Sequence, residues 1–90
     1  MDVVWTARFD SGVRTAFARV LRADRSAAGR LYDRLDAAIA LLAANPGAGR
    51  PYTANVRVWS IRPYRIFYRV EADRLELLVF WHARRQEPEV

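Results

Sequence analysis

The sequence predicts an α+β fold in which an antiparallel sheet packs against an N-terminal helical hairpin, in the order β-α-α-β-β-β. Three observations predict this fold. Apolar residues recur at three- and four-residue steps in the first half of the chain, they alternate at two-residue steps in the second half, and the turn-rich loop NPGAGRPYTAN separates the two halves. Because 90 residues can bury one core but not two, we expect residues 1–90 to form a single domain.

The first half of the chain is expected to form one short strand and two helices. Residues 3–5 are β-branched or aromatic, which predicts the strand. In the segment TARFDSGVRTAFARVLRAD the apolar residues share one helical face, which predicts a first helix ending near Asp24. Ser26 is the predicted N-cap of the second helix, and Asn45-Pro46 ends it because proline disfavours the α conformation in the residue before it. So short a link requires the two helices to lie antiparallel.

The second half is expected to form three strands, at about residues 56–61, 64–70 and 75–81. Val70 faces Leu75 whether the last turn has two residues or four, because both lengths give the same pairs. When this register is continued along the hairpin, one face of the sheet packs against the helices. The residues on that face are Tyr64, Ile66, Tyr68, Val70, Leu75, Leu77, Val79 and Trp81. The opposite face receives Val56, Val58, Ser60, Arg65, Phe67, Arg69, Glu76, Leu78, Phe80 and His82. A second face this apolar is expected to be covered by a partner or to form the floor of a site.

Charge is distributed unevenly along the chain. All fifteen basic residues are arginine, against ten acids, which gives a net charge of +5. No acid lies between Asp36 and Glu71, a stretch that contains Arg50, Arg57, Arg62, Arg65 and Arg69. A GC-rich coding sequence also produces an excess of arginine. If the distribution is functional, it favours nucleic acid, an acidic protein segment or a phosphate-bearing substrate as a partner.

The chain lacks the residues that several kinds of site need. The chain has no cysteine and one histidine, so neither a disulfide framework nor a cluster of metal ligands is expected. The N-terminal residues MDVVWTARF do not resemble a signal peptide, and no segment approaches the roughly 20 apolar residues that cross a bilayer. We therefore expect a cytoplasmic protein that needs no metal, cofactor or membrane.

The central arginines of the last hairpin are expected to differ in role. Arg69 lies opposite Glu76, which predicts a cross-strand ion pair of structural importance only. Arg65 has no acid opposite it, so a bound phosphate or a partner's carboxylate is an alternative to simple exposure.

Three more basic residues follow at the end of the last strand. His82 is either a polar strand terminus or a general base, since its ordinary pKa suits proton transfer near neutrality. Arg84 and Arg85 are either solvated or contact a phosphate or an acidic tail. The segment Gly49-Arg50-Pro51 is too short for a phosphate-binding loop and is interpreted as a structural turn.

Four segments together resemble the RelE/ParE toxins of bacterial type II toxin–antitoxin pairs. They are VVWTARF, LYDRLDAAIALLAANPGAGRPY, PYRIFYRV and VFWHARRQ, and they follow one another in the family's order and spacing over nearly the whole chain. The resemblance implies an antiparallel sheet on a helical hairpin. It also implies a hetero-oligomer with a cognate antitoxin, whose extended and usually acidic C-terminal segment neutralises the toxin.

One branch of this family cleaves mRNA on the ribosome. By resemblance, its catalytic residues would fall on Arg65, His82 and Arg85. That branch also relies on lysines or a glutamate before or in the strand at 56–61, and on a tyrosine or another acid–base group close to the C-terminus. This chain has no lysine, and its tail, QEPEV, has no tyrosine. Cleavage needs stabilisation of the phosphorane charge and acid–base groups, of which only a reduced set is present.

The other branch, ParE, is understood to inhibit DNA gyrase by protein contact without a chemical step. The long helical hairpin and the incomplete catalytic set resemble this branch, so the sequence favours a ParE-like gyrase inhibitor. A ribosome-dependent mRNA endoribonuclease and an inactive toxin retained as an interaction module remain as alternatives. The expected surface for the target or the antitoxin consists of Arg65, Phe67, Phe80, His82, Arg84 and Arg85.

Overall fold

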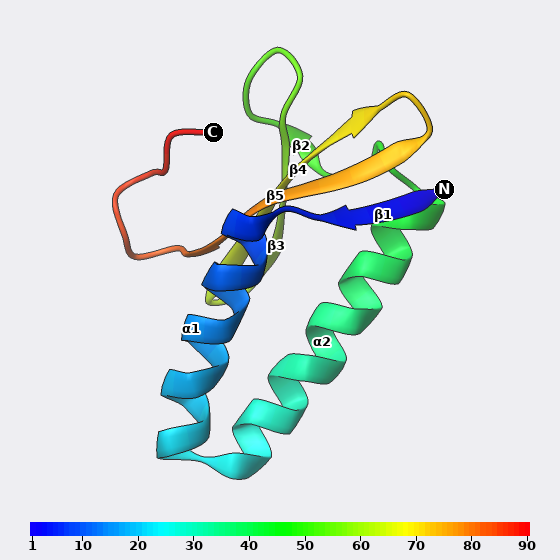
Figure 1. Cartoon of the computed structure of the whole chain (residues 1–90). Helices are drawn as coiled ribbons and strands as arrows, with labels where there is room; N and C mark the ends of the chain where they lie inside the picture. The colour runs from blue at the N-terminus through cyan, green and yellow to red at the C-terminus, as the bar shows by residue number, and fades with distance from the viewer.

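Two helices and five strands follow one another in the predicted order, with one short strand added (Figure 1). The computed structural model describes all residues from 1 to 90. The elements are β1 (Asp2–Trp5), α1 (Ala7–Ala23), α2 (Arg25–Ala44), β2 (Arg50–Pro51), β3 (Arg57–Ile61), β4 (Tyr64–Glu71) and β5 (Arg74–His82). The addition is β2, which lies in the loop interpreted as a structural turn. It pairs with β3 through Arg50 and Pro51.

The N-terminal ends of the two helices are capped by side chains that accept hydrogen bonds from backbone N–H groups. The Thr6 hydroxyl accepts from the backbone N–H of Phe9 and caps α1. The cap of α2 is Asp24 rather than the predicted Ser26, because the carboxylate of Asp24 accepts from the N–H groups of Ser26 and Ala27. An anion at this position is also favoured by the helix dipole. With one residue between them, the helices form the predicted antiparallel hairpin (Figure 1).

The strands form one open sheet in the order β1-β5-β4-β3-β2. The pairs β2–β3, β3–β4 and β4–β5 are antiparallel as predicted, whereas β1 pairs in parallel with β5. The sheet is therefore mixed. Between β3 and β4 the predicted register is confirmed, since Val58 lies opposite Phe67 and Ser60 lies opposite Arg65.

A β-bulge changes the register halfway along the last hairpin. From the turn, Val70 pairs with Leu75 and Tyr68 with Leu77 as predicted, but Phe67 then pairs with Val79, so that Leu78 is the extra residue. Every later residue of β5 consequently lies on the face opposite to the predicted one. Phe80 and His82 lie on the face toward the helices, and Val79 and Trp81 lie on the other face.

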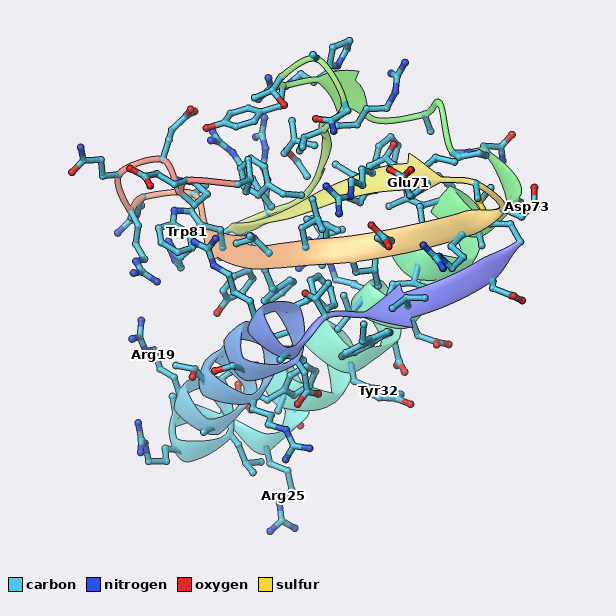
Figure 2. The ribbon with its side chains drawn as sticks, turned by 45° about the horizontal axis from the view of Figure 1, so that its top comes forward. Arg19, Arg25, Tyr32, Glu71, Asp73 and Trp81 are labelled. Atoms are coloured by element: carbon cyan, nitrogen blue, oxygen red, sulfur yellow. The ribbon has the colours of Figure 1, made fainter.

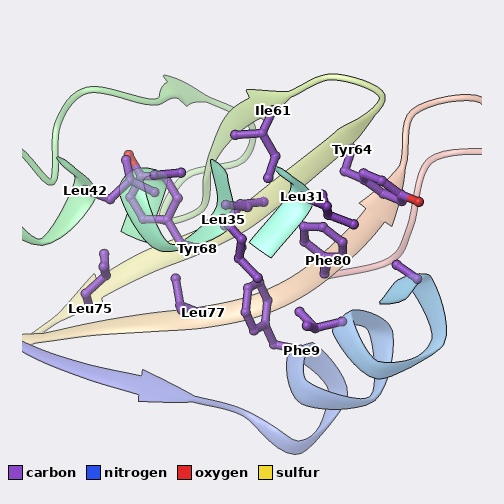
Figure 3. Packing of buried hydrophobic residues seen from close by; sticks show 14 residues of the cluster. Phe9, Leu31, Leu35, Leu42, Ile61, Tyr64, Tyr68, Leu75, Leu77 and Phe80 are labelled. Carbon is purple, nitrogen blue, oxygen red and sulfur yellow. The ribbon is translucent and has the colours of Figure 1, made fainter. Parts of the chain in front are cut away.

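Two apolar clusters lie on the two faces of the sheet. The larger one fills the space between the sheet and the helices, and Figure 3 shows Phe9, Leu35, Tyr68, Leu77 and Phe80 converging there. In this cluster the Phe80 ring stacks on Tyr64 with 4.8 Å between centroids. The smaller cluster lies on the opposite face, which we call the outer face, and consists of Val56, Val58, Phe67 and Val79, with Tyr52, Leu78 and Trp81 packed against it.

The tight turn between β4 and β5 contains a strained residue. Glu71 pairs with Arg74, so the turn consists of Ala72 and Asp73 alone, and Ala72 has a φ of 54°. A left-handed conformation is costly for alanine and almost free for glycine. Ala72→Gly is therefore expected to raise the free energy of unfolding by up to about 1 kcal/mol in urea denaturation. Ala48→Gly, at an exposed turn residue without positive φ, is the control and is expected to lower it; equal losses in both variants would contradict the prediction.

Candidate functional site

The centre of the outer face is Arg65, in the middle strand of the sheet. Its neighbours across the ladders are Ser60 on β3 and Trp81 on β5, neither of which is an acid. The absence of an acid opposite Arg65 is thus as the sequence predicts, while Trp81 replaces the predicted Phe80 because of the bulge. Phe67, two residues later on β4, lies on the same face as Arg65 and belongs to the apolar cluster there.

The C-terminal tail, residues 83–90, folds back over this face and supplies a carboxylate (Figure 1). A side-chain oxygen of Glu87 lies 3.5 Å from a guanidinium nitrogen of Arg65, and the other accepts a hydrogen bond of 2.8 Å from the Tyr52 hydroxyl. The Trp81 indole N–H donates to the carbonyl of Gln86 at 2.9 Å. Pro88 is buried against the same surface. Arg65 therefore has a partner, and it comes from the chain itself.

Tyr52 was not expected in the site, and its ionisation is perturbed by the tail. The hydrogen bond to the Glu87 carboxylate raises the pKa of the Tyr52 hydroxyl, and burial raises it further. The Tyr52 ring packs edge-on against Phe67 with 4.8 Å between centroids. Its position in a turn-rich loop, directly after Arg50-Pro51, gave no periodic signal.

The two arginines after β5 take different positions. The guanidinium of Arg85 lies 3.8 Å from the centroid of the Trp81 ring, a cation–π contact. Arg84 is exposed, and its backbone N–H donates to the Nδ1 atom of His82. Arg65 and Arg85 are thus both close to Trp81.

The structure separates His82 from Arg65. His82 pairs with Tyr64 in the ladder and packs edge-on against its ring, with 5.3 Å between centroids. Because Tyr64 belongs to the helix-side core, His82 lies on the opposite side of the sheet from Arg65. The three residues that would form a nuclease site, Arg65, His82 and Arg85, therefore do not surround one point.

Phe67 and Phe80 also differ from their expected roles. Phe67 has no exposed surface and lies under Tyr52, so it supports the outer face without being accessible to a partner. Phe80 is turned into the helix-side core by the bulge. The accessible residues of the site are instead Arg65, Tyr52, Trp81, Arg85 and Glu87, of which Tyr52, Trp81 and Glu87 were missed by sequence reasoning.

The predicted ion pair between Arg69 and Glu76 is confirmed. A guanidinium nitrogen of Arg69 donates to the Glu76 carboxylate at 2.6 Å, and Arg74 approaches the other carboxylate oxygen at 3.4 Å. The hydrogen bond from Arg69 holds the pKa of Glu76 below its ordinary value of 4.5, with the burial of the carboxylate opposing the shift. The pair belongs to the turn half of the hairpin and has no contact with the tail.

This lowered pKa predicts how stability changes with pH. A carboxyl whose pKa is lower in the folded state stabilises the fold above its unfolded-state value, and loses that contribution as the pH falls through the folded-state value. Glu76→Gln is therefore expected to lower the urea midpoint at pH 7, and the difference from the unmodified protein should shrink as the pH falls below about 4.5. Glu71→Gln, at an exposed position of the same hairpin, is the control. A difference that stays constant from pH 7 to about pH 3 would refute this role for Glu76.

The fold of the chain is also found in a known structure. A mixed sheet with a helical hairpin on one side is shared with a solved structure described as the chromosomal ParDE toxin–antitoxin system from P. aeruginosa. The two chains are 20% identical, the TM-score is 0.78, and the match covers 91% of this chain and 95% of the other. The two chains thus share one fold.

A family model places the chain more closely. The model of the ParE toxin of the type II toxin–antitoxin system parDE matches residues 3–87. The chain therefore belongs to the ParE toxin family, and is a ParE-like toxin whose partner is a cognate antitoxin. Among curated proteins no sequence matches it.

The structure also bears on metal binding and on membrane-spanning helices. No group of three or more histidine, cysteine, aspartate or glutamate side chains is arranged to hold a metal ion. Neither α1 nor α2 has the combination of length and hydropathy that a bilayer crossing requires.

Proposed function

We propose that this ParE-like toxin arrests growth by inhibiting DNA gyrase through protein contact. The observation that carries the proposal is the separation of His82 from Arg65 across the sheet. An RNA-cleaving site needs an acid–base group beside the cations that stabilise the phosphorane. The outer face instead combines arginines with Trp81 and Tyr52, residue types that are enriched in the central contacts of protein interfaces.

The same face is proposed to receive the antitoxin, giving a hetero-oligomer. Glu87 occupies a position next to Arg65 and Tyr52, which means that a carboxylate on an extended segment fits there. An acidic C-terminal segment of the antitoxin would present the same groups, with the surrounding arginines favouring its approach. Binding that depends on these charges weakens as salt rises. Affinity unchanged between about 0.1 M and 1 M NaCl would mean that apolar contacts dominate instead.

The target is tested by the order in which synthesis stops in bacteria after tightly controlled induction. Nascent DNA and nascent protein are pulse-labelled over the first minutes, and purified protein is added to a gyrase supercoiling assay. We expect DNA synthesis to fall first and supercoiling to be inhibited. A first fall in protein synthesis would identify the ribosome-dependent endoribonuclease, and no effect on either would identify an inactive interaction module.

A pair of variants connects this result to the outer face. Arg65→Ala removes the central guanidinium, while Arg25→Ala removes an exposed guanidinium at the start of α2, at the end of the hairpin away from Trp81 (Figure 2). Arg65→Ala is expected to weaken gyrase inhibition by about tenfold or more, the effect of losing a charge-assisted contact. Arg25→Ala should retain inhibition. If both variants inhibit like the unmodified protein, the outer face is not the gyrase-binding surface.

A further inference from the structure

A second cationic site lies on the helix side of the sheet, where α1 meets the end of β5. It is a hollow of about 250 Å³, lined on the helix by Arg8, Ser11, Gly12, Thr15, Ala16 and Arg19. These residues recur at three- and four-residue steps and so form one stripe along α1. The sheet contributes side chains that include His82 and Arg85. Figure 2 shows Arg19 and Trp81, two of the lining residues, on the same side of the molecule.

The hollow carries positive charge without any negative counterpart. Its twelve lining residues include three arginines and one histidine but no aspartate or glutamate. None of the guanidinium groups of Arg8, Arg19 and Arg85 forms a salt bridge, although five other arginines of the chain do. Arg8 donates to a backbone carbonyl, that of Glu89. Three like charges around one hollow repel each other, and a bound anion would remove that repulsion.

The residues that line the hollow carry more hydrogen-bond donors than a carboxylate can accept. They include three arginines and the hydroxyl-bearing residues Ser11 and Thr15. His82 adds its Nε2–H, because its Nδ1 atom accepts a hydrogen bond from the backbone N–H of Arg84. A carboxylate offers two oxygens to these groups, whereas a terminal phosphate offers three strongly accepting oxygens and up to two negative charges.

The hollow is lined by aromatic rings at the point where α1 lies against β5. A Cβ atom at Gly12 would lie 2.8 Å from the carbonyl oxygen of Phe80, so glycine allows α1 to lie directly on β5 at this point. The rings of Tyr64, Phe80 and Trp81 line the hollow beside the arginines. Flat apolar surface next to a cluster of cations suits a ligand that has both a ring and an anionic group.

We propose that this hollow binds the terminal phosphate of a small ring-bearing phosphomonoester, of the size of a nucleoside monophosphate. A terminal phosphate is favoured over a phosphodiester of a nucleic-acid backbone, because a diester carries one negative charge whereas a terminal phosphate carries up to two. Arg65 does not line the hollow, whereas Trp81 and Arg85 line it and also belong to the outer face. The proposal does not rest on which target the toxin inhibits.

The test is a calorimetric titration of the intact protein with AMP, adenosine and a hydroxyl-ended oligoadenylate at one ionic strength. Arg19→Ala removes a guanidinium from the hollow, and Arg22→Ala removes an exposed one from the last turn of the same helix, outside the hollow. AMP is expected to bind at a single site with an affinity that Arg19→Ala lowers about tenfold or more, because a charge-assisted contact is lost. Arg22→Ala should change it less than about threefold.

Each alternative result has a definite meaning. Adenosine that binds as tightly as AMP would overturn the proposal, because the phosphate would then contribute nothing. If Arg19→Ala and Arg22→Ala lower the affinity for AMP equally, the proposal is wrong. AMP would then be attracted by the overall positive charge and not by the hollow. Tighter binding of oligoadenylate per phosphate would assign the surface to a nucleic-acid backbone. If AMP shows no saturable binding up to about 5 mM, any Kd is weaker than the millimolar range and the proposal is wrong.

Discussion

Replacing Gly49 with alanine is expected to lower the free energy of unfolding by about 3 kcal/mol, the sum of overpacking and of a damaged buried hydrogen bond. Gly49 is buried in the loop before β2, and its backbone N–H donates to the Tyr68 hydroxyl at 2.8 Å. An added Cβ would lie 2.5 Å from that hydroxyl oxygen and 2.8 Å from the carbonyl oxygen of Val58. Tyr68 cannot retreat, because it is fully buried and also donates to the carbonyl of Pro46.

Two other glycines provide matched controls for Gly49→Ala. Nothing lies within 4 Å of a Cβ added at Gly47, in the same loop, or at Gly29, inside α2. Gly47→Ala should be nearly neutral, and Gly29→Ala should raise the free energy of unfolding by about 0.5–1 kcal/mol because alanine favours the helix. Urea unfolding followed by circular dichroism gives all three values. If Gly49→Ala unfolds at the same urea concentration as Gly47→Ala, the prediction is wrong. The loop would then move away from Tyr68 and accept the added Cβ without loss of stability.

Phe67→Ala is expected to have the largest effect of any substitution on the outer face, a loss of about 3–5 kcal/mol. Phe67 is completely buried at the centre of the smaller apolar cluster, between Val58 and Val79 in the ladders. Its ring is also the surface against which Tyr52 packs. Since Tyr52 holds Glu87, the cavity left by alanine should loosen the tail as well as the sheet.

This double effect is measured by unfolding in urea together with hydrogen exchange of residues 84–90. Val70→Ala, on the same strand but 42% exposed, is the control and should cost less than about 1 kcal/mol with the tail unchanged. Unchanged exchange in the tail of Phe67→Ala would mean that the tail is held by Trp81 and Pro88 without help from Tyr52. A loss below about 1.5 kcal/mol would mean that the cluster collapses into the space.

The helices and most of the sheet could be predicted from the sequence because their apolar residues are periodic. The stripe along α1 and the stop at Asn45-Pro46 gave both helices, and the alternation along β3 and β4 gave their register. The cap of α2 was misplaced by two residues, since Asp24 and Ser26 are both good caps and only the extended backbone at Asp24 decides between them. The parallel pairing of β1 had no local signal, because its partner is more than seventy residues away.

The β-bulge was missed for a physical reason. Residues 77–81, LLVFW, are all apolar, so they fit either face of the sheet and carry no two-residue alternation. The choice is made by packing, since Phe80 meets Phe9 and Tyr64 on the helix side. Because the bulge shifts the register by one residue, Trp81 lies beside Arg65 and His82 lies on the other side of the sheet. Of the residues predicted to share one surface, Arg65 and Arg85 lie beside Trp81, whereas Phe80 and His82 lie on the helix side of the sheet.

The carboxylate beside Arg65 could not be predicted from local patterns. Glu87 lies in a tail without regular secondary structure, 22 positions after its partner, and a tail of this kind has neither helical nor strand periodicity. The sequence showed that the apolar second face needed a cover. It did not show that the chain's own last residues, together with the loop that carries Tyr52, provide part of that cover.

The bulge at Leu78 also determines which genetic changes the end of β5 can accept. Substitutions between Leu77 and His82 alter one side chain at a time, and each face of the sheet can change independently of the other. Deleting Leu78 would leave Val79 opposite Phe67 and Phe80 opposite Ile66, so the bulge would disappear while every later side chain kept its face. Both cationic surfaces would then retain their residues. In descendants of this toxin, one residue can therefore be lost from this segment without moving either surface to the other side of the sheet.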